Sequence, residues 1–290
     1  MMRAPAAWAV AVRRPDGVIE AISHDLPRLT ARSKLAKVPL FRGVMVLIES
    51  LQLGFKALSW SAEKSGEEDE EISKKEIIGA MVFAVFLAIG LFAVLPVVSA
   101  KWLAGFLGDG SITFVVIDGI IRIGLIVGYV WLISRSKDIQ RVFQYHGAEH
   151  KTIHAYENGR PLDVESIQEY SPRHPRCGTS FLIIVGVVAF FVFLSLAELP
   201  FAWQVASRVL LVPLIAGLSY EVLKAAAGQS WMAWASRPGM WVQAITTKEP
   251  DNLQVEVAIA SLLAALTENE VVEVKQRGAV APGALAAEFG

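Results

Sequence analysis

The stretch MVFAVFLAIGLFAVLPVV, residues 81–98, carries no charged side chain along its whole length. A second run, FLIIVGVVAFFVFLSLA at residues 181–197, is equally apolar. A helix needs about 20 mostly apolar residues to cross a bilayer. Four windows meet this requirement: 77–100, 112–133, 181–199 and 209–227. We therefore predict a mainly α-helical membrane protein with about four transmembrane helices, arranged as two hairpins.

Composition supports a membrane protein over the alternative, the buried helices of a large water-soluble core. Hydrophobic residues make up 54% of the 290 residues, and the mean hydropathy is +0.46. The net charge of −1 gives no basic face for a nucleic-acid partner. Cys177 is the single cysteine, so no intrachain disulfide can form, which fits a reducing compartment. The first residues lack the pattern of a cleaved signal peptide.

Flanking charge predicts the orientation of the spans. Lysine and arginine are frequent in residues 1–76 and 134–180, whereas the connections at 101–111 and 200–207 carry only Lys101. Because positive loops stay in the cytoplasm, we expect a multi-pass protein with both termini and the central insert on the cytoplasmic side.

The segments outside the spans have distinct patterns. Apolar and polar residues alternate around Pro15-Asp16-Gly17, which predicts a β-hairpin. Residues 41–60 confine their polar side chains to one stripe, which predicts an interfacial or re-entrant helix. Trp231, Trp234 and Trp241 suit an aromatic belt, and an amphipathic helix is expected to follow.

Eight segments result from these patterns. They are a cytoplasmic N-terminal β-containing unit (1–40), the interfacial or re-entrant helix (41–60), a charged linker (61–76), transmembrane hairpin 1 (77–133), a histidine-rich cytoplasmic insert (134–180), transmembrane hairpin 2 (181–227), a cytoplasmic tryptophan-rich segment with an amphipathic helix (228–270) and a disordered tail (271–290).

The insert contains YHGAEHKTIHAYE, residues 145–157, with three of the five histidines. At 100° per residue, an arc of about 140° collects five ionisable groups: His146, Glu149, His150, His154 and Glu157. Imidazole and carboxylate ligands suit Zn²⁺ and related divalent ions, and we expect zinc. A solvated helix face and a proton-relay or pH-sensing cluster are the alternatives.

The subset His146-x-x-Glu149-His150 matches the H-x-x-E-H pattern, in which the histidines bind zinc and the glutamate activates water. Glu149 is therefore the predicted catalytic residue. Further candidate ligands are His174 and Cys177 in SPRHPRCGTSF, residues 171–181, just before the third predicted span. Each has a purely structural alternative, an interfacial histidine and a small buried residue.

Several charged residues fall within apolar segments, where a charge is costly and marks a candidate functional position. Glu221 lies near the cytoplasmic end of the fourth predicted span, as a metal ligand or as a partner of Lys224, and Glu49 has the same status. Asp118 and Arg122 form an i, i+4 pair inside the second span. The pair either holds the hairpins together or takes part in transport.

Five blocks together resemble the bacterial DUF1385 family, the YqhQ-like proteins, over nearly the whole chain up to about residue 266. They are MMRAPAAWAVAVRRPDG, RGVMVLIESLQLGFKAL, YHGAEHKTIHAYE, SPRHPRCGTSFL and PGMWVQAITTKEPD. The resemblance implies a metal-dependent enzyme of the bacterial inner membrane. Its implied ligands are His146, His150 and His154, with Glu149 and Glu157 as ligand or base and His174 and Cys177 as additions. Family members also carry a glycine-rich segment before the block that begins here at Met1.

We therefore predict a membrane metal-dependent hydrolase that acts on a membrane protein or a lipid head group. The alternatives are a divalent-cation binder or transporter, with Glu49, Asp118, Arg122 and Glu221 along a path, and a scaffold with a structural metal. The expected partner is the lipid bilayer, without nucleic acid. Because four spans per chain form a pore poorly, the transporter alternative predicts a homo-oligomer.

Overall fold

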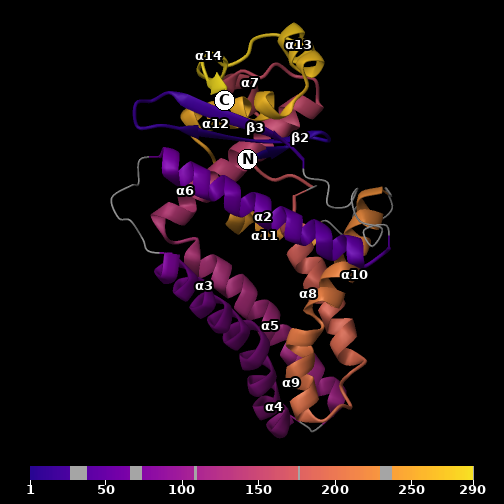
Figure 1. The fold of residues 1–290 in the computed structure, drawn as a ribbon. Coiled ribbons are helices and arrows are strands. Elements are labelled where there is room, and N and C mark those ends of the chain that lie inside the picture. The colour runs from indigo at the N-terminus through magenta and orange to yellow at the C-terminus, as the bar shows by residue number, and fades with distance from the viewer. Residues whose placement is uncertain (27–37, 66–73, 108–109, 176, 229–236, 290) are drawn as a thin grey trace.

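The structure has an upper unit with a small sheet and a lower bundle of apolar helices, and a long helix runs between them (Figure 1). It is a computed structural model. It describes residues 1–26, 38–65, 74–107, 110–175, 177–228 and 237–289.

The N-terminal unit is a four-stranded sheet in the order β1-β2-β3-β4. The strands are β1 (Met2–Arg3), β2 (Ala7–Arg13), β3 (Ile19–Asp25) and β4 (Glu288–Phe289). β2 and β3 form the predicted hairpin, and Gly17 in its turn has a φ of 87°, which glycine adopts without strain. Because side chains alternate along a strand, Ala9 faces one layer, while Trp8 and Val10 face another.

The two faces of the sheet are covered by different helices. Ala9 and Ile19 belong to the main core with α12 (Asn252–Ala265), a helix that is apolar on nearly every side and is accordingly buried. Trp8 and Val10 pack with Leu53 of α2 (Phe41–Lys64). The sheet therefore connects the C-terminal core to the helix that separates the two units.

The prediction of a disordered tail is wrong for the described residues. The chain continues through α13 (Glu268–Gln276) and α14 (Pro282–Leu285) into β4. Val274 and Ala284 are fully buried in the main core. A composition rich in alanine and glycine suggested disorder, but small side chains also allow close packing against α12 and the sheet.

Within the described part of the chain, two helices of the lower bundle are long and apolar enough to cross a membrane, Val82–Leu107 and Ser111–Ile133. The first is assembled from α3 (Lys74–Ile89), the π-helical segment η2 (Gly90–Val94) and α4 (Leu95–Leu107). The second is α5 (Ser111–Ile133). Two of the predicted spans are thereby supported by length and composition.

The predicted second hairpin has a different construction. α8 (Thr179–Leu194) has 16 residues, fewer than a span needs. α9 (Phe201–Leu210) and α10 (Val212–Gly228) meet at a bend of 56°, and they add a third membrane-length segment when counted as one broken span. The expected connection at 200–207 is mostly helical, because α9 begins at Phe201. A four-span count stays a prediction.

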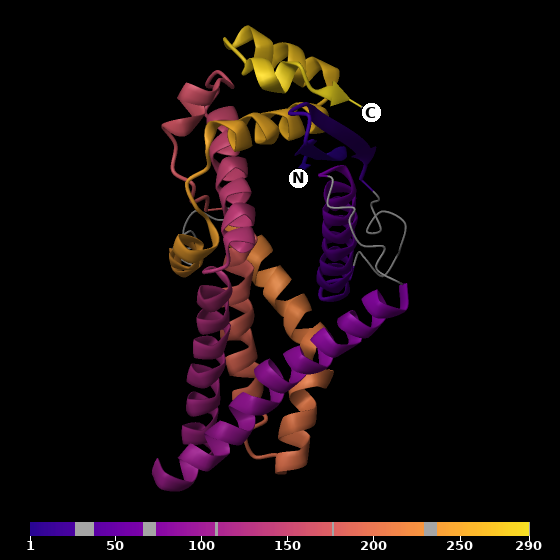
Figure 2. The same ribbon diagram turned by 90° about the vertical axis from the view of Figure 1, so that its left-hand side faces the viewer.

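The central insert is also helical. α6 (Lys137–Glu157) follows α5 almost end to end (Figure 2), and α7 (Val164–Gln168) follows it. α11 (Arg237–Thr246) then leads to α12. The predicted linker at 61–76 is partly helical, since α2 reaches Lys64, and its residues 66–73 lie outside the described part of the chain. Trp231 and Trp234 also lie outside it, whereas Trp241 is exposed.

Candidate metal centre

The histidine-rich sequence forms the C-terminal half of α6, as predicted. One side of this half packs into the main core through Ala148 and Ala155. His150 is buried, and His146 and His154 are half-buried. The histidines of α6 therefore lie at the border of the main core.

A proline-rich loop before α8 faces this helix. In it, His174 is held by the buried Gln243 of α11, whose side chain forms two hydrogen bonds with the backbone of His174. The backbone N–H of His174 donates to Oε1 of Gln243 at 2.9 Å, and the side-chain Nε2 of Gln243 donates to the backbone carbonyl of His174 at 2.9 Å. This clamp positions the loop that ends at Cys177.

Three predicted ligands converge at this place. One ligand atom each from His146, His150 and Cys177 lies within 4.8 Å of the others. The Cys177 sulfur is 3.3 Å from Nε2 of His146, and the two imidazole centroids are 4.4 Å apart. We call this group the His/Cys cluster.

Backbone carbonyls orient both rings of the cluster. Nδ1 of His146 is 2.9 Å from the carbonyl oxygen of Thr246, and Nδ1 of His150 is 2.7 Å from that of Pro172. Since a carbonyl oxygen only accepts, Nδ1 carries the proton in each ring. The lone pair of each neutral ring is therefore on Nε2, the arrangement that fixes the tautomer of metal-binding histidines.

The cluster also favours the thiolate. Burial raises the pKa of Cys177, but hydrogen bonds from His146, His150 and Thr179 outweigh burial and lower the pKa to about 5. Burial lowers the pKa of His146, yet the hydrogen bond with Cys177 leaves it raised overall. Without a metal, the Cys177 thiolate therefore accepts from Nε2 of a protonated His146, whose Nδ1–H is engaged by the Thr246 carbonyl.

Gly147 allows a chain segment to cross α6 between the two ligands. A Cβ at this position would overlap the carbonyl oxygen of Lys248 and lie 3.3 Å from Cβ of Pro172. The crossing segment is fixed by the Lys248 amide, which donates to the Phe143 carbonyl at 3.0 Å. These contacts bring the Thr246 and Pro172 carbonyls to the histidine rings.

His154, Glu157 and His174 form an adjoining group. Nε2 of His174 is 3.4 Å from the Glu157 carboxylate, and the His154 and His174 ring centroids are 4.4 Å apart. His154 has its Nε2 3.0 Å from the carbonyl of Arg173. Burial and repulsion from His154 lower the pKa of His174 to about 4, although Glu157 opposes this. The His174 ring centroid lies 5.7 Å from that of His150.

Other predicted site residues lie elsewhere. The Glu149 carboxylate forms an ion pair with the Met1 amino group, and its charge also raises the pKa of His146. Both oxygens of Glu221 accept from Arg42 at the start of α2. The structure therefore places Glu221 in a helix-packing ion pair, outside the His/Cys cluster.

The buried acids of the apolar segments are also paired. Glu49, 2% exposed, accepts from Arg3 of β1 at 2.6 Å and joins α2 to the sheet. Asp118 accepts from Arg122 at 2.8 Å, as predicted, and also from Arg208 at 3.0 Å.

Sequence reasoning missed Thr246, Gln243 and Arg208. Thr246 and Gln243 act through tertiary contacts, which the spacing of residues along the sequence does not reveal. Arg208 had a usable signal, because a charge beside a predicted span deserves the same attention as Asp118.

Together, the fold and the cluster define a class: a mainly helical protein with membrane-length helices and a buried histidine–cysteine group beside a small sheet. The chain belongs to the DUF1385 family, whose model, described as "Protein of unknown function (DUF1385)", matches residues 38–268. It is similar to "Uncharacterized protein YqhQ" of Bacillus subtilis (strain 168), with 34% identity over 274 residues that cover 88% of this chain and 85% of that protein. No solved structure matches the chain.

Proposed function

We propose that the protein is a membrane metal-dependent enzyme, a hydrolase that uses a metal-activated water at the cytoplasmic face. The observation that carries the proposal is the convergence of His146, His150 and Cys177 within 4.8 Å. Both imidazoles are oriented by carbonyls so that Nε2 is left to bind. The alternative interpretations, a solvated helix face or residues that only pack, do not require ligand atoms to converge in this way.

The donor set fits zinc. One thiolate and two imidazoles are ligands that zinc prefers, and a site with three protein ligands would keep one coordination position open for a water or substrate. Zinc bound in this way lowers the pKa of a water toward neutrality. The protein lowers the pKa of Cys177 to about 5, so at neutral pH the sulfur binds without first losing a proton.

Two carboxylates are candidates for the general base. Glu149 stays the predicted base, since it is adjacent to His150 in sequence and its charge acts on His146. Glu157 is the second candidate, because its partner His174 adjoins the ring of His150. Either would accept the proton of the attacking water, and separate substitutions distinguish them.

The membrane placement belongs to the proposal. The two membrane-length helices, the broken pair α9–α10 and α8 would cross or enter a bacterial inner membrane. Positive charge in residues 1–76 and 134–180 would keep both termini cytoplasmic. α2 would lie in the interface, because it exposes one apolar stripe: Phe41, Ile48, Leu51, Phe55 and Leu58. A cluster at this level suits a membrane protein or lipid head group as substrate.

The cation-transport alternative has less support. Each acid of its expected path has an arginine partner: Arg3 for Glu49, Arg42 for Glu221, and Arg122 and Arg208 for Asp118. A carboxylate that neutralises an arginine is a poor ligand for a divalent cation. The scaffold alternative would share the His/Cys cluster without a requirement for Glu149 or Glu157.

A second candidate function is a hydrolase with Cys177 as nucleophile. The 3.3 Å contact between its sulfur and Nε2 of His146, together with the lowered thiol pKa, is typical of a cysteine–histidine pair. In this case His146 takes up the thiol proton, and no metal is needed.

Metal analysis of the purified full-length protein tests these functions. We expect about one zinc per chain in the wild type and a large loss in His150→Ala, with no loss in His24→Ala, because His24 belongs to the sheet. Retention of zinc with loss of hydrolysis in Glu149→Gln or Glu157→Gln would identify the base. A wild-type protein that binds no divalent metal would contradict the metal-dependent enzyme and favour the cysteine nucleophile.

A further inference from the structure

A second buried cluster lies inside the lower bundle, away from the histidines. Asp118 of α5 accepts from Arg122 on the same helix at 2.8 Å and 3.1 Å, and from Arg208 of α9 at 3.0 Å. The Asp118 and Arg208 side chains are 2% and 1% exposed. We call these three residues the Asp/Arg cluster.

The charges of this cluster do not balance. Arginine keeps its proton in proteins, so two guanidinium groups surround one carboxylate and leave a net charge of +1. Among the described residues, Glu49 and Asp118 are the buried carboxylates, and Glu49 is already paired with Arg3. Since an unpaired charge in an apolar interior is unfavourable, the surplus charge requires a counter-charge.

Two irregular helix segments adjoin the cluster. The π-helical segment η2 presents the carbonyl of Phe92, which accepts a hydrogen bond from Nη1 of Arg122. Arg208 lies on the last turn of α9, directly before the 56° bend to α10. π-Helical segments and broken membrane helices recur where a membrane protein binds a ligand.

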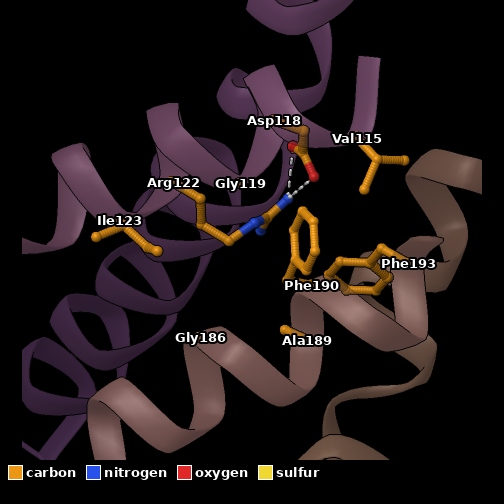
Figure 3. Close-up of a pocket in the computed structure, with 9 residues that line it drawn as sticks. All are labelled: Val115, Asp118, Gly119, Arg122, Ile123, Gly186, Ala189, Phe190 and Phe193. Atoms are coloured by element: carbon orange, nitrogen blue, oxygen red, sulfur yellow. Dashed lines mark hydrogen bonds and ion pairs between the residues drawn. The ribbon is translucent and has the colours of Figure 1, made fainter. Parts of the chain in front are cut away.

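A small cavity borders the cluster between α5 and α8 (Figure 3). It has a volume of about 10 Å³ and is lined by Asp118, Arg122 and the rings of Phe190 and Phe193. This volume is close to the minimum that one water molecule needs, so an anion larger than water would enter only with a shift of the Phe190 or Phe193 ring. The buried Nε atoms of Arg122 and Arg208 have no hydrogen-bond partner in the described structure.

We propose that the Asp/Arg cluster is a membrane-embedded site for one small monovalent anion of halide size, with chloride as the abundant candidate. The anion would neutralise the surplus charge and accept from Arg122, the guanidinium group that lines the cavity. Arg122 supplies the surplus, since Asp118 and Arg208 alone form a neutral pair between helices. The ring of Phe193 packs against both guanidinium groups. Its centroid lies 4.0 Å from the guanidinium of Arg208 and 5.4 Å from that of Arg122.

The test compares the melting temperature of the full-length protein in chloride and in gluconate at matched ionic strength. A ligand that binds the folded state raises Tm with its concentration, and we expect chloride to raise it by about 3 °C or more. Arg122→Leu should abolish this shift, because it removes the surplus charge. Arg122→Gln serves the same purpose if the leucine variant does not fold.

Two controls locate the effect. Lys101→Leu removes a cation that lies over the Phe201 ring, outside the cluster, and should keep the chloride shift. His150→Ala should keep it as well, which separates this inference from the metal proposal. Equal melting temperatures of the wild type in chloride and gluconate would overturn the anion site. So would a shift that survives Arg122→Leu or Arg122→Gln, or one that disappears in His150→Ala.

Discussion

The His/Cys cluster and the Asp/Arg cluster gather ionisable groups in two buried places, with opposite results. In the first, Nδ1 of His146 and of His150 is turned outward to a carbonyl, so that their ligand atoms and the Cys177 sulfur lie within 4.8 Å of one another. In the second, two guanidinium groups face one carboxylate. The first arrangement is electron-rich and suits a cation, whereas the second has surplus positive charge and suits an anion.

The comparison indicates that hydrogen bonds from a buried cluster to the groups around it determine whether the cluster favours a cation or an anion. Three histidines on one helix face are compatible with a metal site, a proton relay or simple packing. The carbonyls of Thr246 and Pro172 fix the tautomers and favour the first of these. Likewise, Asp118 and Arg208 alone form a neutral pair between helices, and the addition of Arg122 gives the site a net positive charge.

The largest expected effect follows from removal of the carboxylate at the centre of the Asp/Arg cluster. Asp118→Leu leaves Arg122 and Arg208 without an anionic partner, and breaking a buried charge pair costs about 3–5 kcal/mol. We expect Tm in detergent to fall far more than in Arg122→Leu. The double substitution Asp118→Leu/Arg122→Leu should recover part of the loss. An equal Tm for Asp118→Leu and Arg122→Leu would contradict the proposal that the cluster carries surplus positive charge.

The second effect concerns Gly147, which tests whether the backbone crossing builds the His/Cys cluster. Gly147→Ala forces apart α6 and the Lys248 carbonyl, and with it the segment that carries the Thr246 carbonyl. Loss of such an outer contact lowers metal affinity by about 10- to 100-fold. The matched control is Gly54→Ala in α2, where a Cβ meets nothing within 4 Å. Unchanged zinc affinity in Gly147→Ala would show that the carbonyl is not needed.

A third effect tests the loop clamp. Gln243→Met keeps the side-chain volume but removes both hydrogen bonds to the His174 backbone, and buried groups left without partners cost about 1–3 kcal/mol. We expect a lower Tm and weaker zinc binding, because the same loop carries Cys177. Gln140→Met on the exposed side of α6 is the control, and it should change neither quantity.

The smallest effect is a pH dependence of Cys177. With its pKa lowered to about 5, the thiol of the metal-free protein is already ionised at pH 6, so its alkylation rate by iodoacetamide should be nearly constant up to pH 8. An ordinary thiol of pKa about 8.5 would react roughly seventy-fold faster at pH 8 than at pH 6. His146→Ala removes a hydrogen bond that lowers the pKa and should steepen the profile. A steep wild-type profile would contradict the thiolate.

Much of the local structure could be predicted from the sequence. The β2–β3 hairpin, the helical insert and the common face of His146 and His150 follow from periodicities of two and 3.6 residues. The metal-ligand set could not be chosen in this way. Glu221 was as plausible a ligand as Cys177, since both approach the same level, and only the Arg42 ion pair excludes Glu221 from the cluster.

The sequence by itself determined that this is a mainly helical chain with membrane-length apolar helices and an imidazole-rich α6. Those properties depend on hydrophobicity and helical spacing, which act over a few turns of chain. The tertiary structure alone decided that Cys177 joins His146, that Thr246 orients it, and that Arg208 meets Asp118. These contacts join residues 31, 100 and 90 positions apart, and their geometry depends on how the helices pack.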